Sequence, residues 1–395
     1  MLDINAYNKS PPQMRVAVLQ RVLPEYRKSL FVHLASRGDI QMRIFIGEDL
    51  PNSKVKSTLN FDSLDVMLLP TRFFKFFRRI LLHHKGLIRA LQEFKPNVIL
   101  CEGESNILSY LKALLYRLMN PKVALVHWSL GGMPGESHTN RFTHFLKRSL
   151  LSSFDMFLVY SSYGRGRLIQ LGCPIDKVKV AFNVSDTERH LELYSKLNLN
   201  KEQVRAQLGL LNNFTVIYVG SIDEDKRLRE LILSAAKLKN SKISLILVGS
   251  GPLKRALQQF ANELGLNNVH FIGKLSWSEL TRYYRASDIF VLPGRGGMVI
   301  SESMAHGIPV VVYQADGTED DLIRDRSTGI CLRNGTVDEI SSTILWLKSN
   351  PDISKKMGKA AQTLIKEGFS QLKSANAIYD VLLRAALSTE HRNRS

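Results

Sequence analysis

A glycine-rich turn between two apolar runs has the residue types that bind an anion. Residues 289–312 read as a buried strand, a turn, a short helix and a second buried strand, and Gly294, Gly296 and Gly297 lie in the turn. Glycines let the backbone approach a ligand, and the helix directs unpaired N–H groups at the same gap. Glu302, about one turn into the helix, could accept hydrogen bonds from vicinal hydroxyls such as those of a ribose. Ordinary turns also use glycine and solvated helices also use glutamate, so these residues alone leave both interpretations open.

Two further strand ends carry glycine turns. Gly249 and Gly251 follow an apolar run and precede a proline, which is favoured at the first position of a helix. Gly220 ends another apolar run, and Lys226 follows at loop distance, where its ammonium group could neutralise a pyrophosphate. Open α/β sheets bind ligands where the carboxyl ends of their strands meet. The three turns together therefore favour a phosphate site more strongly than any one of them.

Short apolar runs alternate with longer amphipathic stretches along the chain, which is the pattern of βα units and a parallel sheet. The expected strands are 16–20, 43–46, 98–101, 123–126, 156–160, 215–219, 243–248, 269–271, 289–292 and 310–312. The expected helices are 26–37, 76–93, 105–119, 137–152, 162–171, 229–239, 253–264, 277–286 and 298–306. The pattern predicts an α/β protein with two doubly wound halves.

The length of 395 residues suits two domains of ordinary size. Residues 1–13 are polar, lack the apolar core of a secretory signal, and are expected to be a disordered lead-in. We expect the N-terminal domain over 14–184 and the C-terminal domain over 214–369. The polar segment 185–213 has no apolar strand and is expected to link them. A helix at 370–388 is expected to pack back on the N-terminal domain.

The composition is that of a soluble globular protein, with 44% apolar and 23% charged residues. No apolar run approaches the length that spans a bilayer, so we expect a cytoplasmic protein. Cys101, Cys173 and Cys331 are scattered and have no CxxC pattern or histidine cluster beside them. They are expected to be buried thiols, and neither a disulfide framework nor a structural zinc is expected.

The formal charge of +18 predicts anionic partners, but charge alone does not choose among them. The densest basic stretch, 71–89, interleaves cations with Phe73, Phe74, Phe76 and Phe77. This stretch could lie on an anionic membrane surface, which would make the protein peripheral on the inner face of the cytoplasmic membrane. A core helix with a basic outer face is an equal alternative. Nucleic acid is not an expected partner, because no recognised binding motif accompanies the charge.

The ordered motifs of the second half resemble the donor domain of retaining glycosyltransferases of family 4, which have the GT-B architecture. The matching segments are 219–226, 248–252, 269–273, 286–288 and 302–310. The first half is similar more loosely, as an acceptor-binding domain would be. The resemblance implies two Rossmann-like domains that face a central cleft.

The resemblance implies three residues with catalytic roles. Lys226 would bind the donor diphosphate, and Glu302 would hold the ribose hydroxyls. His127, which follows an apolar run of the first half, matches a histidine near the reacting carbon of the sugar. Without the resemblance, a lone histidine is more often a structural residue.

The resemblance also implies contacts from the backbone. The chain around Gly273 and Lys274 would meet the base. The amides of Gly297, Met298 and Val299 would meet phosphate and sugar.

Two positions depart from the family pattern. The family usually has two glutamates separated by seven residues, and the position eight before Glu302 is Gly294. The Pro-Gly turn found here resembles a sub-branch of family 4 that builds bacterial surface polysaccharides. The family also has an arginine five residues before the lysine, where this chain has Ser221. Arg295, inside the glycine turn, is the preferred replacement.

Two other arginines, Arg227 and Arg229, are the alternative cations. The acidic segment 316–321 could reach the sugar, or could form an ordinary helix N-terminus.

The resemblance implies transfer of a sugar, with retention, from a nucleotide-diphosphate donor to a cell-envelope polysaccharide or a lipid-linked glycan. Helix N-termini and lysine can stabilise the leaving diphosphate without metal, so no metal and no cofactor beyond the donor substrate are expected. Two alternatives stay open: a nucleotide-sugar epimerase of the same fold, and a non-catalytic protein that binds sugar nucleotides as a scaffold.

Overall fold

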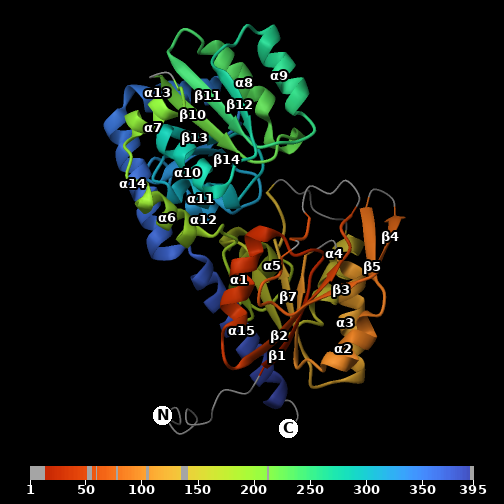
Figure 1. The fold of residues 1–395 in the computed structure, drawn as a ribbon. Helices are drawn as coiled ribbons and strands as arrows, with labels where there is room; N and C mark the ends of the chain where they lie inside the picture. The colour runs from red at the N-terminus through yellow and green to blue at the C-terminus, as the bar shows by residue number, and fades with distance from the viewer. Residues whose placement is uncertain are drawn as a thin grey trace.

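The computed structural model describes residues 14–391, apart from 51–55, 59, 77–78, 104–105, 135–140 and 211–212. The described chain forms two α/β domains, and Figure 1 shows them one above the other. The expected lead-in 1–13 and Phe77 lie outside the described residues.

The N-terminal domain contains a seven-stranded parallel sheet in the order β3-β2-β1-β6-β7-β8-β9. Its strands are β1 (Met14–Leu19), β2 (Ile40–Gly47), β3 (Val66–Leu69), β6 (Val98–Glu102), β7 (Ala124–Ser129), β8 (Met156–Val159) and β9 (Val178–Val180). Its helices are α1 (Glu25–Ala35), α2 (Leu87–Phe94), α3 (Ile107–Met119), α4 (Arg141–Leu151) and α5 (Ser162–Gln170). The strands are apolar at successive positions because helices cover both faces of the sheet.

The two faces of this sheet have separate cores. On one face, α1 packs together with α15 (Gln371–His391), the last helix of the chain. On the other face, α2 and α3 contribute most of the buried helical side chains. The helix expected at 370–388 is thus present, and it lies against the N-terminal sheet as Figure 1 shows in blue.

One expected helix is wrong in its first part. The chain forms an antiparallel hairpin of β4 (Thr71–Phe76) and β5 (Arg79–His84), and a helix begins only at Leu87. Thr71 pairs with His84, and Gly86 adopts a left-handed conformation with φ of 72° that separates the hairpin from α2. The aromatic and branched residues of this stretch favour an extended chain, a preference that the basic helical pattern hid.

The C-terminal domain contains a six-stranded parallel sheet in the order β12-β11-β10-β13-β14-β15. Its strands are β10 (Phe214–Val219), β11 (Ile243–Val248), β12 (Val269–Gly273), β13 (Ile289–Leu292), β14 (Val310–Tyr313) and β15 (Gly329–Leu332). Its helices are α8 (Leu228–Lys237), α9 (Lys254–Glu263), α10 (Trp277–Ala286), α11 (Met298–Ala305), α12 (Glu319–Leu322), α13 (Val337–Ser349) and α14 (Pro351–Gly368). The order of strands reverses at β10, which is where such sheets leave a crevice.

The segment expected as a linker, 185–213, contains two helices. They are α6 (Thr187–Lys196) and α7 (Lys201–Gln207), and both pack on α10 of the C-terminal domain. The side chain of Asp186 caps α6, and Asn200 forms a capping box with Gln203 at the start of α7. The polar composition that suggested a linker therefore belongs to two short, well-capped helices.

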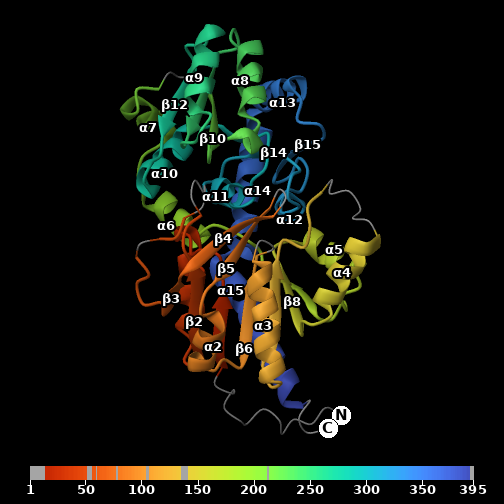
Figure 2. The ribbon, with the colours of Figure 1, turned by 90° about the vertical axis from the view of Figure 1, so that its right-hand side faces the viewer.

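Two chain crossings join the domains. In the first, the backbone N–H of Ser185 donates to the hydroxyl of Ser301 on α11 at 3.1 Å. In the second, the amide of Gln371 donates to the carbonyl of Tyr26 on α1 at 2.9 Å and to that of Val184 at 3.4 Å. Figure 2 shows α14 and α15 leading from one domain to the other. Ser185 thus links the stretch 184–185 to α11, and Gln371 links the same stretch to α1.

Candidate functional site

The glycine turns lie at the carboxyl edge of the C-terminal sheet. A pocket of about 530 Å³ opens there, and four of the predicted residues line it: Gly220, Gly249, Gly251 and Lys274. The carbonyl of Gly273, a fifth predicted residue, accepts a hydrogen bond from the N–H of Gly249 at 2.7 Å. The structure therefore brings these five residues together around one pocket.

Close packing between the loops themselves requires two of these glycines. Gly249 has a φ of 138°, and a Cβ atom there would overlap the carbonyl of Gly220. A Cβ atom on Gly251 would lie 2.6 Å from the carbonyl carbon of Ile222. Packing is thus a sufficient reason for glycine at 249 and 251, and it also exposes backbone toward the pocket.

Lys226 lies beside the other glycine turn. It ends a 3-10 turn, η2 (Glu224–Lys226), and its ammonium group donates to the carbonyl of Arg295. The N–H of Arg295 donates in return to the carbonyl of Asp225 at 2.8 Å. Burial lowers the pKa of Lys226, and the charge of Arg295 lowers it further, although Asp223, Asp225 and Asp316 oppose the change. A bound anion would relieve this cost by pairing with the ammonium group.

Gly294 is packed against the same turn. A Cβ atom at this position would lie 2.6 Å from the carbonyl carbon of Lys226 and would overlap the carbonyl oxygen of Asp225. No side chain fits there unless the backbone moves. The glutamate that family 4 usually carries at this position is therefore replaced by contact between two backbone turns.

The three candidate cations have different environments. Arg227 donates to the carbonyl of Gly335 at 2.9 Å, and its guanidinium lies 5.0 Å from the ring centre of Tyr313. Arg229 lies 3.8 Å from the ring centre of Phe260. Arg295 is exposed and acts on Lys226 through its charge. Both alternative arginines are thus engaged in packing, and Arg295 is the one beside the lysine.

The N-terminus of α11 faces an acidic turn. Gly297 caps the helix, and a Cβ atom there would lie 2.5 Å from the hydroxyl of Thr318. The half-buried Met298 and Val299 follow in the first helical turn. Burial, followed by the charge of Asp316, raises the pKa of Glu319 in this turn to about 7. The segment 316–321 therefore lies against Gly297, the first of the residues whose amides are predicted to meet phosphate and sugar.

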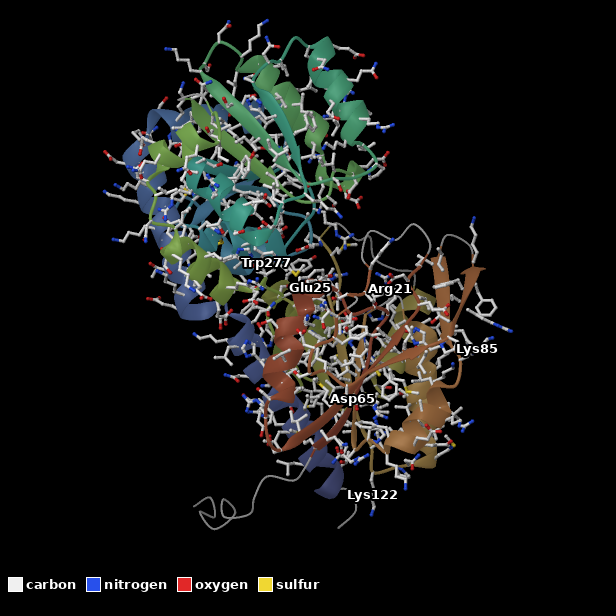
Figure 3. The ribbon with its side chains drawn as sticks, viewed as in Figure 1. Arg21, Glu25, Asp65, Lys85, Lys122 and Trp277 are labelled. Carbon is white, nitrogen blue, oxygen red and sulfur yellow. The ribbon has the colours of Figure 1, made fainter. Side chains whose placement is uncertain are left out.

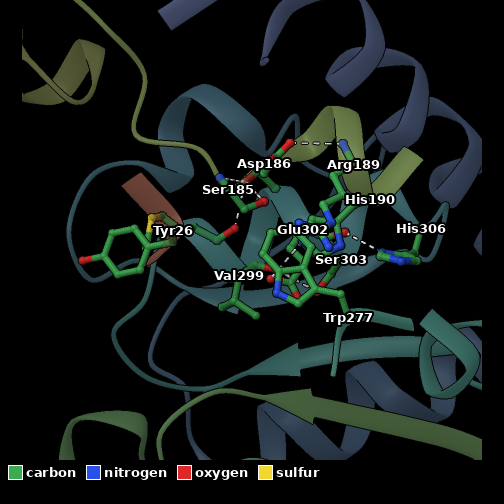
Figure 4. Close-up of polar contacts among 12 residues, drawn as sticks. Tyr26, Ser185, Asp186, Arg189, His190, Trp277, Val299, Glu302, Ser303 and His306 are labelled. Carbon is green, nitrogen blue, oxygen red and sulfur yellow. Dashed lines mark hydrogen bonds and ion pairs between the residues drawn. The ribbon is translucent and has the colours of Figure 1, made fainter. Parts of the chain in front are cut away.

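Glu302 is held by two side chains. Its carboxylate accepts a hydrogen bond from the hydroxyl of Tyr284 at 2.9 Å, and Nε2 of His190 lies 3.4 Å from its other oxygen. The carboxylate side chain is 17% exposed. Burial raises its pKa, but the contacts of His190 and Tyr284 outweigh this, so that the pKa lies below its ordinary value. Glu302 is therefore ionised and fixed in place, and Figure 4 shows it beside His190.

Aromatic rings enclose this carboxylate. His190 stacks on Trp277 with ring centres 4.7 Å apart and an interplanar angle of 11°. His306 stacks on Tyr284 at 4.3 Å, and Nδ1 of His306 lies 2.9 Å from the carbonyl oxygen of Glu302. Burial lowers the pKa of His306 to about 3, so it is neutral near pH 7. The rings come from α6, α10 and the end of α11 and form one wall.

The sequence interpretation missed His190, Tyr284 and His306. His190 lies on α6, Tyr284 lies on α10, and His306 directly follows α11, so the three are far apart in the sequence. A glutamate in the middle of a helix that buries most of its residues was the available signal, because a buried carboxylate requires partners.

The structure places His127 in an enclosed environment. The residue is 6% exposed, and its ring packs edge-on against Tyr110 at 5.5 Å and Phe154 at 5.2 Å. Burial lowers its pKa to about 4. Its Nδ1 has no hydrogen-bond partner among the residues that the structure describes. The imidazole is thus neutral, and its predicted role near the reacting carbon stays a prediction.

A second buried polar cluster lies at the carboxyl edge of the N-terminal sheet. Arg27 donates to Glu102 at 2.5 Å and to the hydroxyl of Tyr160 at 2.6 Å, and that hydroxyl donates to Glu102 at 2.7 Å. The guanidinium also lies 4.8 Å from the ring centre of Trp128. This cluster, which the sequence did not reveal, fixes α1 to the strand ends β6 to β8.

Within the described ranges, no group of three or more His, Cys, Asp or Glu residues could hold a metal ion. In the same part of the chain, no helix combines the length and the apolar character needed to cross a bilayer.

Two family models match the chain in succession. Residues 29–189 match the model described as Glycosyltransferase Family 4, and residues 200–364 match Glycosyl transferases group 1. The sulfoquinovosyl transferase SQD2 of Arabidopsis thaliana is 33% identical over 165 residues, which cover 40% of this chain and 31% of that protein.

A lipid mannosyltransferase is another relative. The GDP-mannose-dependent monoacylated alpha-(1-6)-phosphatidylinositol monomannoside mannosyltransferase of Corynebacterium glutamicum is 24% identical over 184 residues, which cover 43% of this chain and 48% of that protein. The matches to both relatives thus span less than two thirds of the relatives' own length.

A solved structure matches the whole architecture. Anabaena HepE in complex with UDP superimposes with a TM-score of 0.72 at 18% identity and covers 93% of this chain and 99% of its own. The predicted fold class, two doubly wound parallel-sheet domains, is confirmed. The two domains therefore match the Glycosyltransferase Family 4 model and the Glycosyl transferases group 1 model in turn, and together they have the GT-B fold.

Proposed function

We propose that this chain transfers a sugar from a nucleoside-diphosphate donor to a cell-envelope polysaccharide or a lipid-linked glycan. The observation that carries the proposal is the contact of the Lys226 ammonium group with the turn at Arg295, from which α11 leads to Glu302. HepE binds UDP, and the mannosyltransferase relative uses GDP-mannose on a phosphatidylinositol mannoside. Both support a nucleotide-sugar donor, and the second supports a lipid-linked acceptor.

The proposed chemistry follows from the charge that develops during transfer. The leaving diphosphate gains negative charge, and Lys226, Arg295 and the amides at the start of α11 would stabilise it. Glu302, fixed by Tyr284 and His190, would orient the ribose hydroxyls. The proposal includes retention of configuration, which the resemblance to family 4 implies. It also includes a reaction without a metal ion, because cationic side chains and amides would face the diphosphate.

The location is also part of the proposal. The protein would act in the cytoplasm, peripheral on the inner face of the cytoplasmic membrane, where the segment 71–89 would meet anionic lipid. Phe74 of this segment is 48% exposed and Phe73 is half-buried. Both phenylalanines belong to the hairpin rather than to a helix.

A panel of nucleotide sugars tests the proposal. A donor that binds the native protein raises its melting temperature, and we expect slow release of nucleoside diphosphate when water replaces the acceptor. Tight binding without release toward any acceptor would favour the scaffold alternative. Conversion of the donor sugar into its epimer, with the nucleotide still attached, would favour the epimerase.

Replacing Glu302 with alanine is expected to weaken donor binding about tenfold or more, because a charged hydrogen-bond acceptor for the ribose is lost. The change also leaves Tyr284 and His190 without their partner, so stability should fall by about 1–3 kcal/mol. Calorimetric titration with the donor, well below the melting temperature, measures the affinity. Unchanged affinity would remove Glu302 from the ribose site.

For His127 the informative variant is His127→Phe, which keeps a ring between Tyr110 and Phe154. We expect turnover to fall about a hundredfold, with donor affinity and melting temperature largely kept, since only the imidazole nitrogens are lost. Steady-state kinetics and thermal melting check both parts. An unaltered rate would show that the imidazole has no chemical role.

A further inference from the structure

Helix α3 is apolar on both of its faces. Tyr110, Ala113 and Tyr116 are buried against the sheet. The opposite face is a stripe of exposed apolar side chains: Ile107 at 39%, Leu111 at 51%, Leu115 at 50%, Leu118 at 79% and Met119 at 49%. A surface helix normally carries polar residues on its outer face, so this stripe indicates a binding surface.

More exposed apolar side chains lie on the neighbouring elements. Phe74 and Ile80 of the β4–β5 hairpin are 48% and 43% exposed, and β5 packs against α3. On α4, Phe145 and Leu146 are 66% and 50% exposed. Figure 2 shows α3 in front of the N-terminal sheet, with the hairpin on one side of it and α4 on the other. The stripe on α3 is therefore accompanied by further exposed apolar side chains on the hairpin and on α4.

This face is basic at its edges. Residues 66–153 contain thirteen Lys and Arg residues and four Asp and Glu residues, which accounts for half of the net charge of +18. The hairpin 71–84, α3 and α4 contain no acidic residue. Lys85 and Lys122 are exposed at opposite ends of this side of the N-terminal domain, as Figure 3 shows. A partner of this surface must therefore be both apolar and anionic.

We propose that α3 is the element that docks this protein on an anionic membrane. The stripe from Ile107 to Met119 lies parallel to the bilayer and enters the interface between headgroups and acyl chains, while the surrounding cations contact lipid phosphates. On the hairpin, Phe74 and Ile80 lie on opposite faces, because Phe74 pairs with Leu81 and Ile80 pairs with Lys75, so only one of the two can face the bilayer beside α3. A second copy of the chain fits less well, because a two-fold contact through this face would oppose like charges.

The inference rests on the proposed function in one respect, since a membrane would present a lipid-linked acceptor to the cleft. It changes the earlier expectation for 71–89, where four phenylalanines of one segment were to enter the membrane. In the structure, the longest apolar stripe lies on α3, outside that segment.

The test is sedimentation with vesicles of phosphatidylcholine, with and without phosphatidylglycerol. We expect the native protein to bind the anionic vesicles, and a Leu111→Gln, Leu115→Gln, Leu118→Gln triple variant to bind at least about tenfold more weakly. A matched variant, Leu345→Gln, Ile353→Gln, Leu372→Gln, removes leucine and isoleucine side chains that are 38–48% exposed on α13, α14 and α15, and should bind as the native protein does. The α3 variant should keep its melting temperature, because the replaced side chains are exposed and glutamine favours helices.

Three results would overturn the inference. The first is vesicle binding by the α3 variant equal to that of the native protein. The second is loss of binding only when the hairpin residues Phe74 and Ile80 are replaced by serine. The third is a native protein that ignores vesicles but forms a dimer in sedimentation velocity, which the α3 variant abolishes.

Donor hydrolysis separates this inference from the proposed function. The α3 variant should release nucleoside diphosphate at the native rate, because α3 lies in the domain that does not contain Lys226 or Glu302. Vesicle binding without any donor turnover would overturn the proposed function alone. Donor turnover without vesicle binding would overturn the docking surface alone.

Discussion

Replacing Lys226 with alanine is expected to lower turnover of the nucleotide-sugar donor by about a hundredfold to a thousandfold. The ammonium group lies on the turn at Arg295, next to the helix N-terminus that would receive the same phosphates. Removing it leaves the leaving diphosphate with backbone amides and one exposed guanidinium. The loss should appear mainly in kcat, because the charge on the diphosphate grows toward the transition state.

Two variants control for this result. Lys226→Arg keeps the charge but changes the geometry of a half-buried site, so partial activity is expected. Lys239→Ala removes an exposed lysine from the turn that follows α8 and should leave kcat unchanged. Steady-state release of nucleoside diphosphate measures all three. Native turnover in the Lys226→Ala variant would contradict the diphosphate role.

The lowered pKa of Lys226 gives this prediction a second readout. Only the protonated amine pairs with the diphosphate, so donor affinity should decline as the pH rises through that lowered pKa. Without donor the sign for stability is opposite: a lysine with a depressed pKa costs least when neutral, so its cost to folding falls as the pH rises. Binding should also take up protons in this range. Calorimetry in buffers of different ionisation enthalpy detects that uptake, and the Lys226→Ala variant should lose it.

The sequence predicted the parallel sheets well because their strands are buried on both faces. The runs at 98–101 and 289–292 are apolar at every position, and the run at 243–248 is apolar at every position except Ser244. Such continuous apolar runs are typical of a strand between two helical layers. The hairpin at 71–84 has no such signal. It lies at the surface, and its alternating pattern is hidden by a charge distribution that also suits a helix.

The candidate site was predictable where it consists of backbone, and less so where it consists of side-chain contacts. Gly249 and Gly273 follow strand ends, so their place at the sheet edge follows from topology. The topology does not predict which side chains contact Glu302. His190 reaches it from α6, in a segment that reads as a polar linker, and only the packing of α6 on α10 and α11 brings the two together.

Gly294 shows how a family pattern can mislead. The sequence alone suggests that the missing glutamate changes the contacts to the donor sugar. In the structure, the position has no room for a side chain, because the turn at Asp225 and Lys226 packs directly on it. The glycine thus sets the position of Lys226, and its effect on the donor site is indirect.

Restoring the family residue should therefore damage the protein. We expect Gly294→Glu to lower the free energy of unfolding by at least about 3 kcal/mol, since its Cβ atom would overlap the Asp225 carbonyl before the carboxylate is placed. Gly294→Ala should cost nearly as much, because the overlap begins at Cβ. Gly166→Glu is the matched control, since nothing lies within 4 Å of a Cβ atom at that exposed helical position.

Urea unfolding of the three variants measures these differences, and donor titration shows what happens to the site. If the turn at Asp225 moves to admit the side chain, Lys226 moves with it, and donor affinity should fall even where the fold survives. A Gly294→Glu variant as stable as the native chain, with tighter donor binding, would mean the opposite. The two turns would then be separable, and this site would differ from the two-glutamate pattern only by the side chain it lacks.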